Sequence, residues 1–190
     1  MARLIYFVTA SLNGYITDER GQFGWAEPDE EVHQFVNDLI RDVGTHLYGR
    51  RMYETMMVWE TEPSLAEESP VMRDFAEIWQ QADKIVYSTT LAAVQTERTR
   101  LERNFDPEAV QHLVSSSARD VVVGGPGLAS HAFRAGLVDE CHIILVPIVV
   151  RAGTRFLPDD VLLELDLVTE RRFNSGMVYL QYRRKTRLRQ

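Results

Sequence analysis

The stretch Val121-Val122-Val123-Gly124-Gly125-Pro126-Gly127-Leu128 decides the fold. Three β-branched residues in succession predict a short, fully buried strand. The glycines then leave the backbone bare, and Pro126 fits the first turn of a helix that runs from Leu128 to about Ala135, with Gly136 as its cap. Unpaired N–H groups at a helix N-terminus favour phosphate. A tight turn without a ligand is the alternative, because the third glycine of the dinucleotide-binding pattern Gly-x-Gly-x-x-Gly is absent.

The composition is that of a globular protein with a single domain, residues 1–190. Of the 190 residues, 45% are hydrophobic and 26% are charged, which is enough for a sizeable core. The net charge of −7 argues against nucleic-acid binding. No apolar run approaches the ~20 residues of a membrane span. With no recognisable signal peptide and one cysteine, Cys141, expected to be buried and inert, we expect a cytoplasmic protein that binds neither nucleic acid nor membrane.

Two further features predict no site. The histidines have no metal-ligand spacing with cysteines or acids, so no metal is expected. The chain ends in a basic cluster, which we interpret as a solvated end rather than a polyanion site; it comprises Arg183, Arg184, Lys185, Arg187 and Arg189.

Strands alternate with helices along the chain. We expect strands at residues 4–10, 45–48, 84–87, 99–102, 121–123 and 141–146, and helices beginning near residues 28, 50, 71, 107 and 126. The segment 59–70 is acidic and contains proline, and is expected to be a loop. Two final strands, 163–173 and 177–184, flank the hairpin signal Asn174-Ser175-Gly176. This order predicts an α/β fold: a three-layer α-β-α sandwich whose mostly parallel central sheet ends in a C-terminal antiparallel hairpin.

Residues suited to anion binding follow three of the predicted strands, and they are Gly49-Arg50-Arg51, Ser88-Thr89-Thr90 and Gly124 to Gly127. Two arginines at the start of a helix oppose its dipole unless an anion lies there, and guanidinium groups bind phosphate bidentately. Ligands of parallel sheets gather at the carboxyl ends of the strands. Three such turns in one chain favour an extended ligand with several phosphates, such as a dinucleotide.

A candidate proton donor lies in the helix that follows the loop 18–24. Glu31 precedes Phe35 by one turn, at the edge of an apolar stripe, where desolvation raises the pKa of a carboxyl group. The alternative is that Glu31, with Asp29 and Glu30, only complements the helix dipole. Trp25 ends the preceding loop, which is either a lid over a pocket or a plain surface loop.

With these residues in view, the chain resembles the dihydrofolate reductase-like superfamily, and especially the RibD C-terminal family of riboflavin biosynthesis. The resemblance extends from Leu4 to about Tyr182. It is carried by Ser11-Leu12-Asn13-Gly14, by Leu47 to Glu54, by Gly125-Pro126-x-Leu128 and by Ala135 to Glu140.

The resemblance implies NADPH as cofactor and a role for each matching residue. Gly49, Arg50, Arg51, Ser88 and Thr89 would hold the side of NADPH that carries the 2′-phosphate. Gly124, Gly125, Pro126, Gly127 and Leu128 would hold the pyrophosphate, and the resemblance allows a cis Gly124–Gly125 peptide. Thr9, Ala10 and Ile16 would line the nicotinamide, and Trp25, Glu31 and Phe35 would face the substrate; Asp29 and Glu30 remain alternatives to Glu31. Ile144 stands where the superfamily usually has a threonine that partners the catalytic carboxylate.

The resemblance therefore implies an NADPH-dependent oxidoreductase similar to the 5-amino-6-(5-phosphoribosylamino)uracil reductase. Such an enzyme transfers hydride to a small heterocyclic or ribosylamino substrate. Dihydrofolate reductase activity is the first alternative, and a non-catalytic nucleotide-binding scaffold is the second. The C-terminal hairpin and apolar strand faces allow a homodimer.

Overall fold

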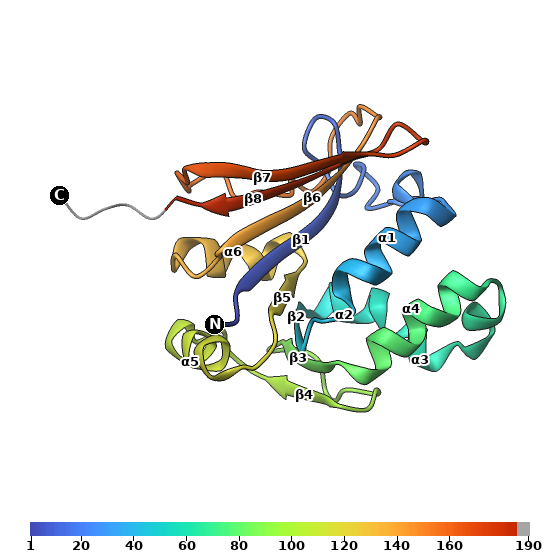
Figure 1. The fold of residues 1–190 in the computed structure, drawn as a ribbon. Helices are drawn as coiled ribbons and strands as arrows, with labels where there is room; N and C mark the ends of the chain where they lie inside the picture. Colours follow the sequence, from blue (N-terminus) through green and yellow to red (C-terminus); the bar gives the residue numbers. More distant parts are fainter. Residues whose placement is uncertain (186–190) are drawn as a thin grey trace.

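The computed structural model describes residues 1–185, so Arg187 and Arg189 of the basic cluster lie outside the described residues. The described chain forms one eight-stranded sheet covered by helices (Figure 1). The strands are β1 (Leu4–Ser11), β2 (Thr45–Gly49), β3 (Asp83–Tyr87), β4 (Thr99–Glu102), β5 (Val121–Gly124), β6 (Glu140–Val146), β7 (Leu165–Arg172) and β8 (Val178–Arg184).

The strand order is β4-β3-β2-β5-β1-β6-β8-β7. All pairs from β4 to β6 are parallel, whereas β8 is antiparallel to both β6 and β7. This confirms the predicted mostly parallel sheet and its C-terminal hairpin. β5 lies inside the sheet, between β2 and β1. Its Val121, Val122 and Val123 are almost wholly buried, as the run of β-branched residues predicted.

The helices are α1 (Glu30–Ile40), α2 (Arg50–Met56), α3 (Val58–Thr61), α4 (Pro70–Gln81), α5 (Pro107–Ser116) and α6 (Pro126–Arg134), with short 3-10 turns at Gly24–Ala26 and Pro63–Glu67. Side chains of Asp29, Ser69 and Asp106 cap α1, α4 and α5. Each cap fixes the residue at which its helix begins.

The prediction of a loop over 59–70 was wrong, because α3 and a 3-10 turn occupy most of this segment. Trp59 packs against Phe75 of α4 with ring centroids 4.7 Å apart, and its carbonyl accepts a hydrogen bond from Gln80 at 2.7 Å. Packing against α4 thus stabilises helical turns that the acidic, proline-bearing composition alone does not favour.

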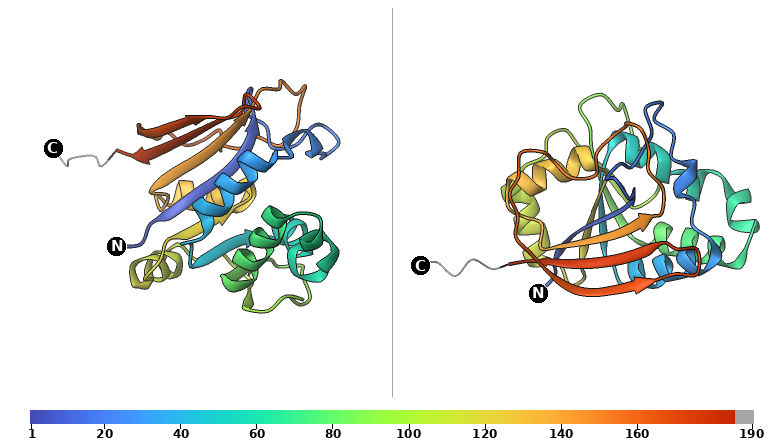
Figure 2. Two further views of the ribbon diagram at one scale, coloured as in Figure 1. Left: turned by 45° about the vertical axis from the view of Figure 1, so that its right-hand side comes forward. Right: turned by 90° about the horizontal axis from the view of Figure 1, so that it is seen from above.

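Helices cover both faces of the sheet (Figure 2). Two apolar cores hold these layers together. On one face α5 and α6 cover the sheet, with Tyr6, Leu47 and Phe133 among the buried residues. On the other face α1, α2 and α4 cover it, with Tyr53 and Trp79 among the buried residues. This arrangement confirms the α-β-α sandwich.

The hairpin β7–β8 forms the end of the sheet beside α1. A third apolar cluster joins Val32 of α1 to Phe173 and Tyr179 of the hairpin. β7 is the outermost strand, and its Leu167 and Val168 are exposed. An outer strand with exposed apolar side chains is compatible with a second copy of the chain, so the homodimer stays a prediction. None of the helices among residues 1–185 is long and apolar enough to cross a bilayer.

Candidate functional site

Strand register brings the three predicted anion-binding turns to one edge of the sheet. Gly49 pairs with Tyr87 of β3, and Tyr48 pairs with Gly124 of β5. The residues that follow these strands therefore leave the sheet side by side at its carboxyl edge. This is the edge at which ligands of parallel sheets bind.

The Gly124–Gly125 turn is packed closely against α2. A Cβ atom on Gly124 would lie 2.9 Å from the ring of Tyr48, and one on Gly125 would lie 3.3 Å from Met52 Cβ. Gly125 also has a φ of +85°, which L side chains rarely adopt. The expectation of a cis Gly124–Gly125 peptide was wrong, because no peptide bond among residues 1–185 is cis. The chain turns here through the positive φ of Gly125.

Beyond these two glycines the turn opens toward solvent. A Cβ on Gly127 would meet no atom within 4 Å, and Gly127 is exposed in the first turn of α6. Leu128, the next residue, is buried against the sheet. The backbone of Gly127 is thus accessible, whereas the rest of the turn is fixed by packing.

Arg50 links two of the turns. Its guanidinium donates to the hydroxyl of Thr90 at 3.1 Å and to the carboxylate of Glu54 at 2.7 Å. Arg51 is exposed and makes no ion pair within residues 1–185. The cationic residues predicted for the cofactor phosphate are therefore at the carboxyl edge, one of them partly neutralised.

The hydroxyl of Ser88 is used inside its own turn. It accepts hydrogen bonds from the backbone N–H groups of Thr90 and Leu91, at 3.2 and 2.9 Å, and Ser88 is buried. Thr89 is exposed. Ser88 shapes the turn, and Thr89 presents its side chain to solvent.

The residues predicted to line the nicotinamide lie on β1 and in the loop after it. Thr9 is half-buried and pairs with Ile144, and Ala10 is fully buried. The backbone N–H of Ile16 donates to Thr154 at 2.8 Å, and Asn13 bonds twice to the backbone of Val150. The loops after β1 and β6 are thus tied together beside the end of β1.

The acidic residues at the start of α1 have separate roles. Asp29 caps the helix, accepting from the Val32 N–H at 2.9 Å. Glu30 is exposed. The carboxylate of Glu31 reaches across to the hairpin, where it accepts two hydrogen bonds from Asn174 and pairs with Arg171 at 3.3 Å. Of the three, Glu31 alone joins α1 to the hairpin.

The aromatic residues predicted to face the substrate lie in the same region. Phe35 packs edge-on against Phe173 and Tyr179, with centroids 5.2 and 4.7 Å apart, and the Arg171 guanidinium lies over its ring at 5.0 Å. The indole nitrogen of Trp25 is buried and has no hydrogen-bond partner within the described part of the chain. A buried donor without a hydrogen-bond partner requires an acceptor, which a ligand or an ordered water would provide.

The sequence patterns do not predict the hydrogen-bonded chain of buried polar side chains between β6 and β8. Glu140 is wholly buried and bonds to His142 Nε2 at 3.1 Å, and the other ring nitrogen of His142 bonds to the Tyr179 hydroxyl at 3.0 Å. Burial alone would raise the pKa of Glu140, but donors from His142, Arg183 and Gln181 lower it to about 2. Burial lowers the pKa of His142. The pairing of β8 with β6, which local sequence does not reveal, creates this chain.

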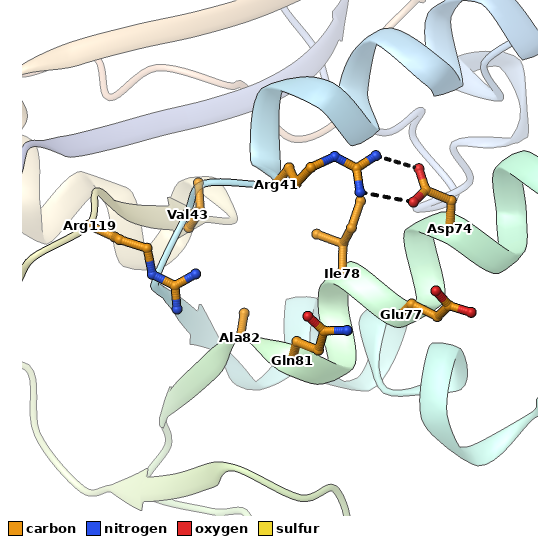
Figure 3. Close-up of a pocket in the computed structure, with 8 residues that line it drawn as sticks. All are labelled: Arg41, Val43, Asp74, Glu77, Ile78, Gln81, Ala82 and Arg119. Carbon is orange, nitrogen blue, oxygen red and sulfur yellow. Dashed lines mark hydrogen bonds and ion pairs between the residues drawn. The ribbon is translucent and has the colours of Figure 1, made fainter.

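Two cavities lie away from these turns. One, of about 80 Å³, is lined by residues that precede β2, β3 and β5, including Val43, Ala82 and Arg119 (Figure 3). The other, of about 200 Å³, lies between Arg3 and Arg183. Both are at the amino edge of the parallel strands, where ion pairs such as Arg41–Asp74, 2.8 Å, already satisfy the charges. Neither belongs to the candidate site. No group of acids, histidines and cysteine within residues 1–185 has the geometry to hold a metal ion.

The family model described as the RibD C-terminal domain matches residues 2–179. The chain belongs to the RibD C-terminal domain family. The uncharacterized protein YyaP of Bacillus subtilis (strain 168) is 25% identical over 182 residues, covering 95% of this chain and 94% of its own.

Two solved structures share the fold of this chain. A putative riboflavin biosynthesis protein from Shewanella sp. PV-4 has a TM-score of 0.76 at 20% identity and covers 98% of this chain and 100% of its own. Dihydrofolate reductase from Enterococcus faecalis, complexed with NADP(H), has a TM-score of 0.65 at 16% identity and covers 97% of each chain. The predicted dihydrofolate reductase-like fold is confirmed.

Proposed function

We propose that this member of the RibD C-terminal domain family is an NADPH-dependent reductase. The observation that carries the proposal is the convergence of three turns, each predicted to bind anions, at one sheet edge, with Arg50 bonded to Thr90 across two of them. The residues fit a phosphate-bearing cofactor: the Gly127 backbone is open, and Arg51 is without an ion-pair partner in the described chain. NADPH, when bound, would supply hydride to a carbon of the substrate.

The chain itself would orient the cofactor and exclude water. Gly124 to Leu128 would hold the pyrophosphate, because accessible N–H groups at the start of α6, which has nine residues, favour negative charge. Arg50 and Arg51 would favour NADPH over NADH, because their positive charge complements the additional phosphate. Thr9, Ala10 and Ile16 would flank the nicotinamide at the end of β1.

The substrate class we propose is a small heterocyclic or ribosylamino compound, as in riboflavin biosynthesis. Its C=N or C=O carbon would accept the hydride, and the adjacent nitrogen or oxygen would take a proton. Trp25, Glu31 and Phe35 lie in one region beside the hairpin. We propose Glu31 as the residue that delivers this proton, directly or through a water.

The test is a titration with NADPH and NADH, monitored through tryptophan fluorescence, followed by turnover assays with the ribosylaminopyrimidine of riboflavin biosynthesis and with dihydrofolate. We expect NADPH to bind at least tenfold more tightly than NADH. Arg50→Ala and Arg51→Ala should each weaken NADPH about tenfold and NADH much less. Arg73→Ala, an exposed arginine on α4, is the matched control and should change neither. If the protein binds neither nucleotide, the proposed reductase function is refuted.

A non-catalytic nucleotide-binding scaffold is the second candidate. The observation in its favour is that Glu31 is already engaged by Asn174 and Arg171. Tight NADPH binding without oxidation in the presence of either substrate would support the scaffold. Turnover that falls at least tenfold in Glu31→Gln, with NADPH affinity unchanged, would support the enzyme.

A further inference from the structure

Three buried side chains form a hydrogen-bonded chain on the face of the sheet that α1 covers. Glu140 and His142 are two residues apart on β6, so both side chains point to this face. On the neighbouring strand β8, Tyr179 lies opposite Ile144, the next β6 residue of the same face. His142 bonds to Glu140 through Nε2 at 3.1 Å and to the Tyr179 hydroxyl through Nδ1 at 3.0 Å. The three bonded residues are at most 5% exposed, so none of them contacts a substrate directly.

The ionised carboxylate of Glu140 fixes the direction of each hydrogen bond in this chain. Burial alone raises the pKa of Glu140, but hydrogen bonds from His142, Arg183 and Gln181 lower it to about 2. The carboxylate is therefore ionised at neutral pH and only accepts hydrogen bonds, so Nε2 of His142 carries a hydrogen and donates it. Burial lowers the pKa of His142 from its ordinary value of 6.5, so the imidazole is neutral at pH 7 and its Nδ1 accepts from the Tyr179 hydroxyl.

The ring of Tyr179 connects this chain to the proposed substrate region. It packs against Phe35 of α1, with ring centroids 4.7 Å apart and an angle of 66° between the planes. Phe35 is only half-buried, and Glu31 precedes it by one turn. Because the Tyr179 hydroxyl is fastened to His142, the ring cannot move away from Phe35 without breaking a buried hydrogen bond.

We propose that Tyr179 is a positioning residue for the substrate and that it acts through Phe35. The hydroxyl, held by His142 and Glu140, fixes the Tyr179 ring, and this ring fixes the orientation in which Phe35 meets the substrate. The inference rests on the proposed function, because it requires a substrate beside Phe35. The phosphates of the cofactor are proposed to lie at the ends of β2, β3 and β5, whereas this chain joins β6 to β8. Loss of the Tyr179 hydroxyl should therefore impair use of the substrate and spare NADPH binding.

Protonation of His142 would break the same link, because a doubly protonated imidazole has no acceptor for the Tyr179 hydroxyl. Burial has the largest effect on the pKa of His142 and lowers it, so this change is expected below pH 6.5. From α1, apolar side chains face this part of the sheet, and they are Val32, Phe35, Val36 and Leu39. The charged groups around His142 come from the strands and their ends, and they are Glu140 on β6, Arg183 on β8, Arg3 before β1 and Asp120 before β5.

The experiment compares Tyr179→Phe with Tyr182→Phe, a matched control on β8 whose ring packs against the opposite core. It measures the NADPH dissociation constant, and kcat and KM for the ribosylaminopyrimidine of riboflavin biosynthesis and for dihydrofolate, from about pH 8 to about pH 5. At pH 7 we expect Tyr179→Phe to lower kcat/KM about tenfold and to change NADPH affinity less than about twofold. Tyr182→Phe should behave as the wild type.

The pH profile provides a readout that a merely structural role would not change. In the wild type, kcat/KM should decrease below pH 6.5 as His142 is protonated, and Tyr179→Phe should lack this decrease. His142→Gln is the conservative variant, because its amide keeps one donor for Glu140 and one acceptor for Tyr179 but cannot be protonated. It should retain most of the wild-type kcat/KM at pH 7 and should also lack the decrease in acid.

The outcomes separate this inference from the proposed function. If the wild type reduces a substrate and Tyr179→Phe reduces it equally well, the inference is wrong and the proposed function stands. An equal loss of NADPH affinity and of kcat/KM would indicate a general structural role for Tyr179 and would also overturn the inference. If the wild type reduces neither substrate, the proposed function fails and takes the inference with it. Circular dichroism and thermal unfolding identify misfolding of Tyr179→Phe, and in that case the pH profile of His142→Gln decides.

Discussion

The carboxylate of Glu31 accepts two hydrogen bonds from Asn174, one from its backbone N–H and one from its side-chain amide, each 3.0 Å long. The two residues are 143 positions apart in the chain. Their contact fastens the first turn of α1 to the turn of the β7–β8 hairpin. The residue predicted as a proton donor is therefore also a structural tie beside the proposed substrate region.

The hydrogen bonds between Glu31 and Asn174 predict that Glu31 stabilises the hairpin turn. Glu31→Ala leaves the Asn174 N–H and the Arg171 guanidinium without this acceptor, and should lower the free energy of unfolding by about 1–2 kcal/mol. Amide exchange at Asn174 should become faster. Glu30→Ala, the exposed neighbour, is the control and should change stability by less than about 0.5 kcal/mol. Urea unfolding and hydrogen exchange measure both, and equal effects of the two variants would contradict the tie.

The surroundings of the glycine turn predict different effects on stability for substitutions at Gly124 and at Gly127. Gly124→Ala places a methyl group 2.9 Å from the buried Tyr48 ring, so it should destabilise the protein by about 1–3 kcal/mol. Gly127→Ala meets no atom within 4 Å and should leave the melting temperature unchanged or slightly raised.

The Gly127 variant also tests the cofactor site. If the pyrophosphate of NADPH lies against this backbone, the added methyl group should weaken NADPH binding about tenfold even though the fold is intact. Thermal unfolding and NADPH titration of the same sample separate the two effects. Unchanged NADPH affinity in Gly127→Ala would place the pyrophosphate elsewhere.

His46 predicts a loss of stability in mild acid. Burial first, and the nearby Lys84 second, lower the pKa of this fully buried imidazole to about 4. Below pH 6.5, the ordinary pKa of histidine, the unfolded chain therefore binds a proton at this residue that the folded protein does not bind. Stability consequently falls as the pH decreases from 6.5 toward 4. Between pH 7 and 5 the loss should be about 2 kcal/mol.

The measurement is urea unfolding at both pH values. His46→Gln should flatten the pH dependence. His112→Gln, which changes an exposed histidine on α5, should leave it as in the wild type. An equally steep dependence in His46→Gln would rule out this residue as the source.

Glu140 predicts a further loss in stronger acid. Its pKa of about 2, against an ordinary value of 4.5, means that the unfolded chain takes up an additional proton between these pH values. The stability that depends on the ionised carboxylate is therefore present above pH 4.5 and is lost toward pH 2.

Glu140→Gln removes the negative charge that Arg3 and Arg183 share and should cost about 2–4 kcal/mol at pH 7. The difference from the wild type should narrow below pH 4.5. Glu170→Gln, an exposed acid on β7, is the control and should have little effect at either pH. Denaturant unfolding across this pH range is the measurement, and a difference that stays constant would contradict the assigned pKa shift.

The sequence by itself determined the local elements and their order. The valines of β5, the glycine–proline turn and the acidic residues near positions 29 and 106 predicted where strands and helices begin, because these patterns involve residues close in the chain. The β4 prediction at 99–102 also agrees with the structure. Alternation of these elements was enough for the α-β-α sandwich.

The tertiary structure alone decided which side chains meet. Glu31 and Asn174, Arg103 and the Ser88–Leu91 turn, and the Glu140–His142–Tyr179 chain all join segments that are adjacent only because of strand order and register. The helical turns at 58–67 likewise depend on packing against α4. Contacts across the sheet are set by burial and pairing over the whole domain, so no local pattern of residues can specify them.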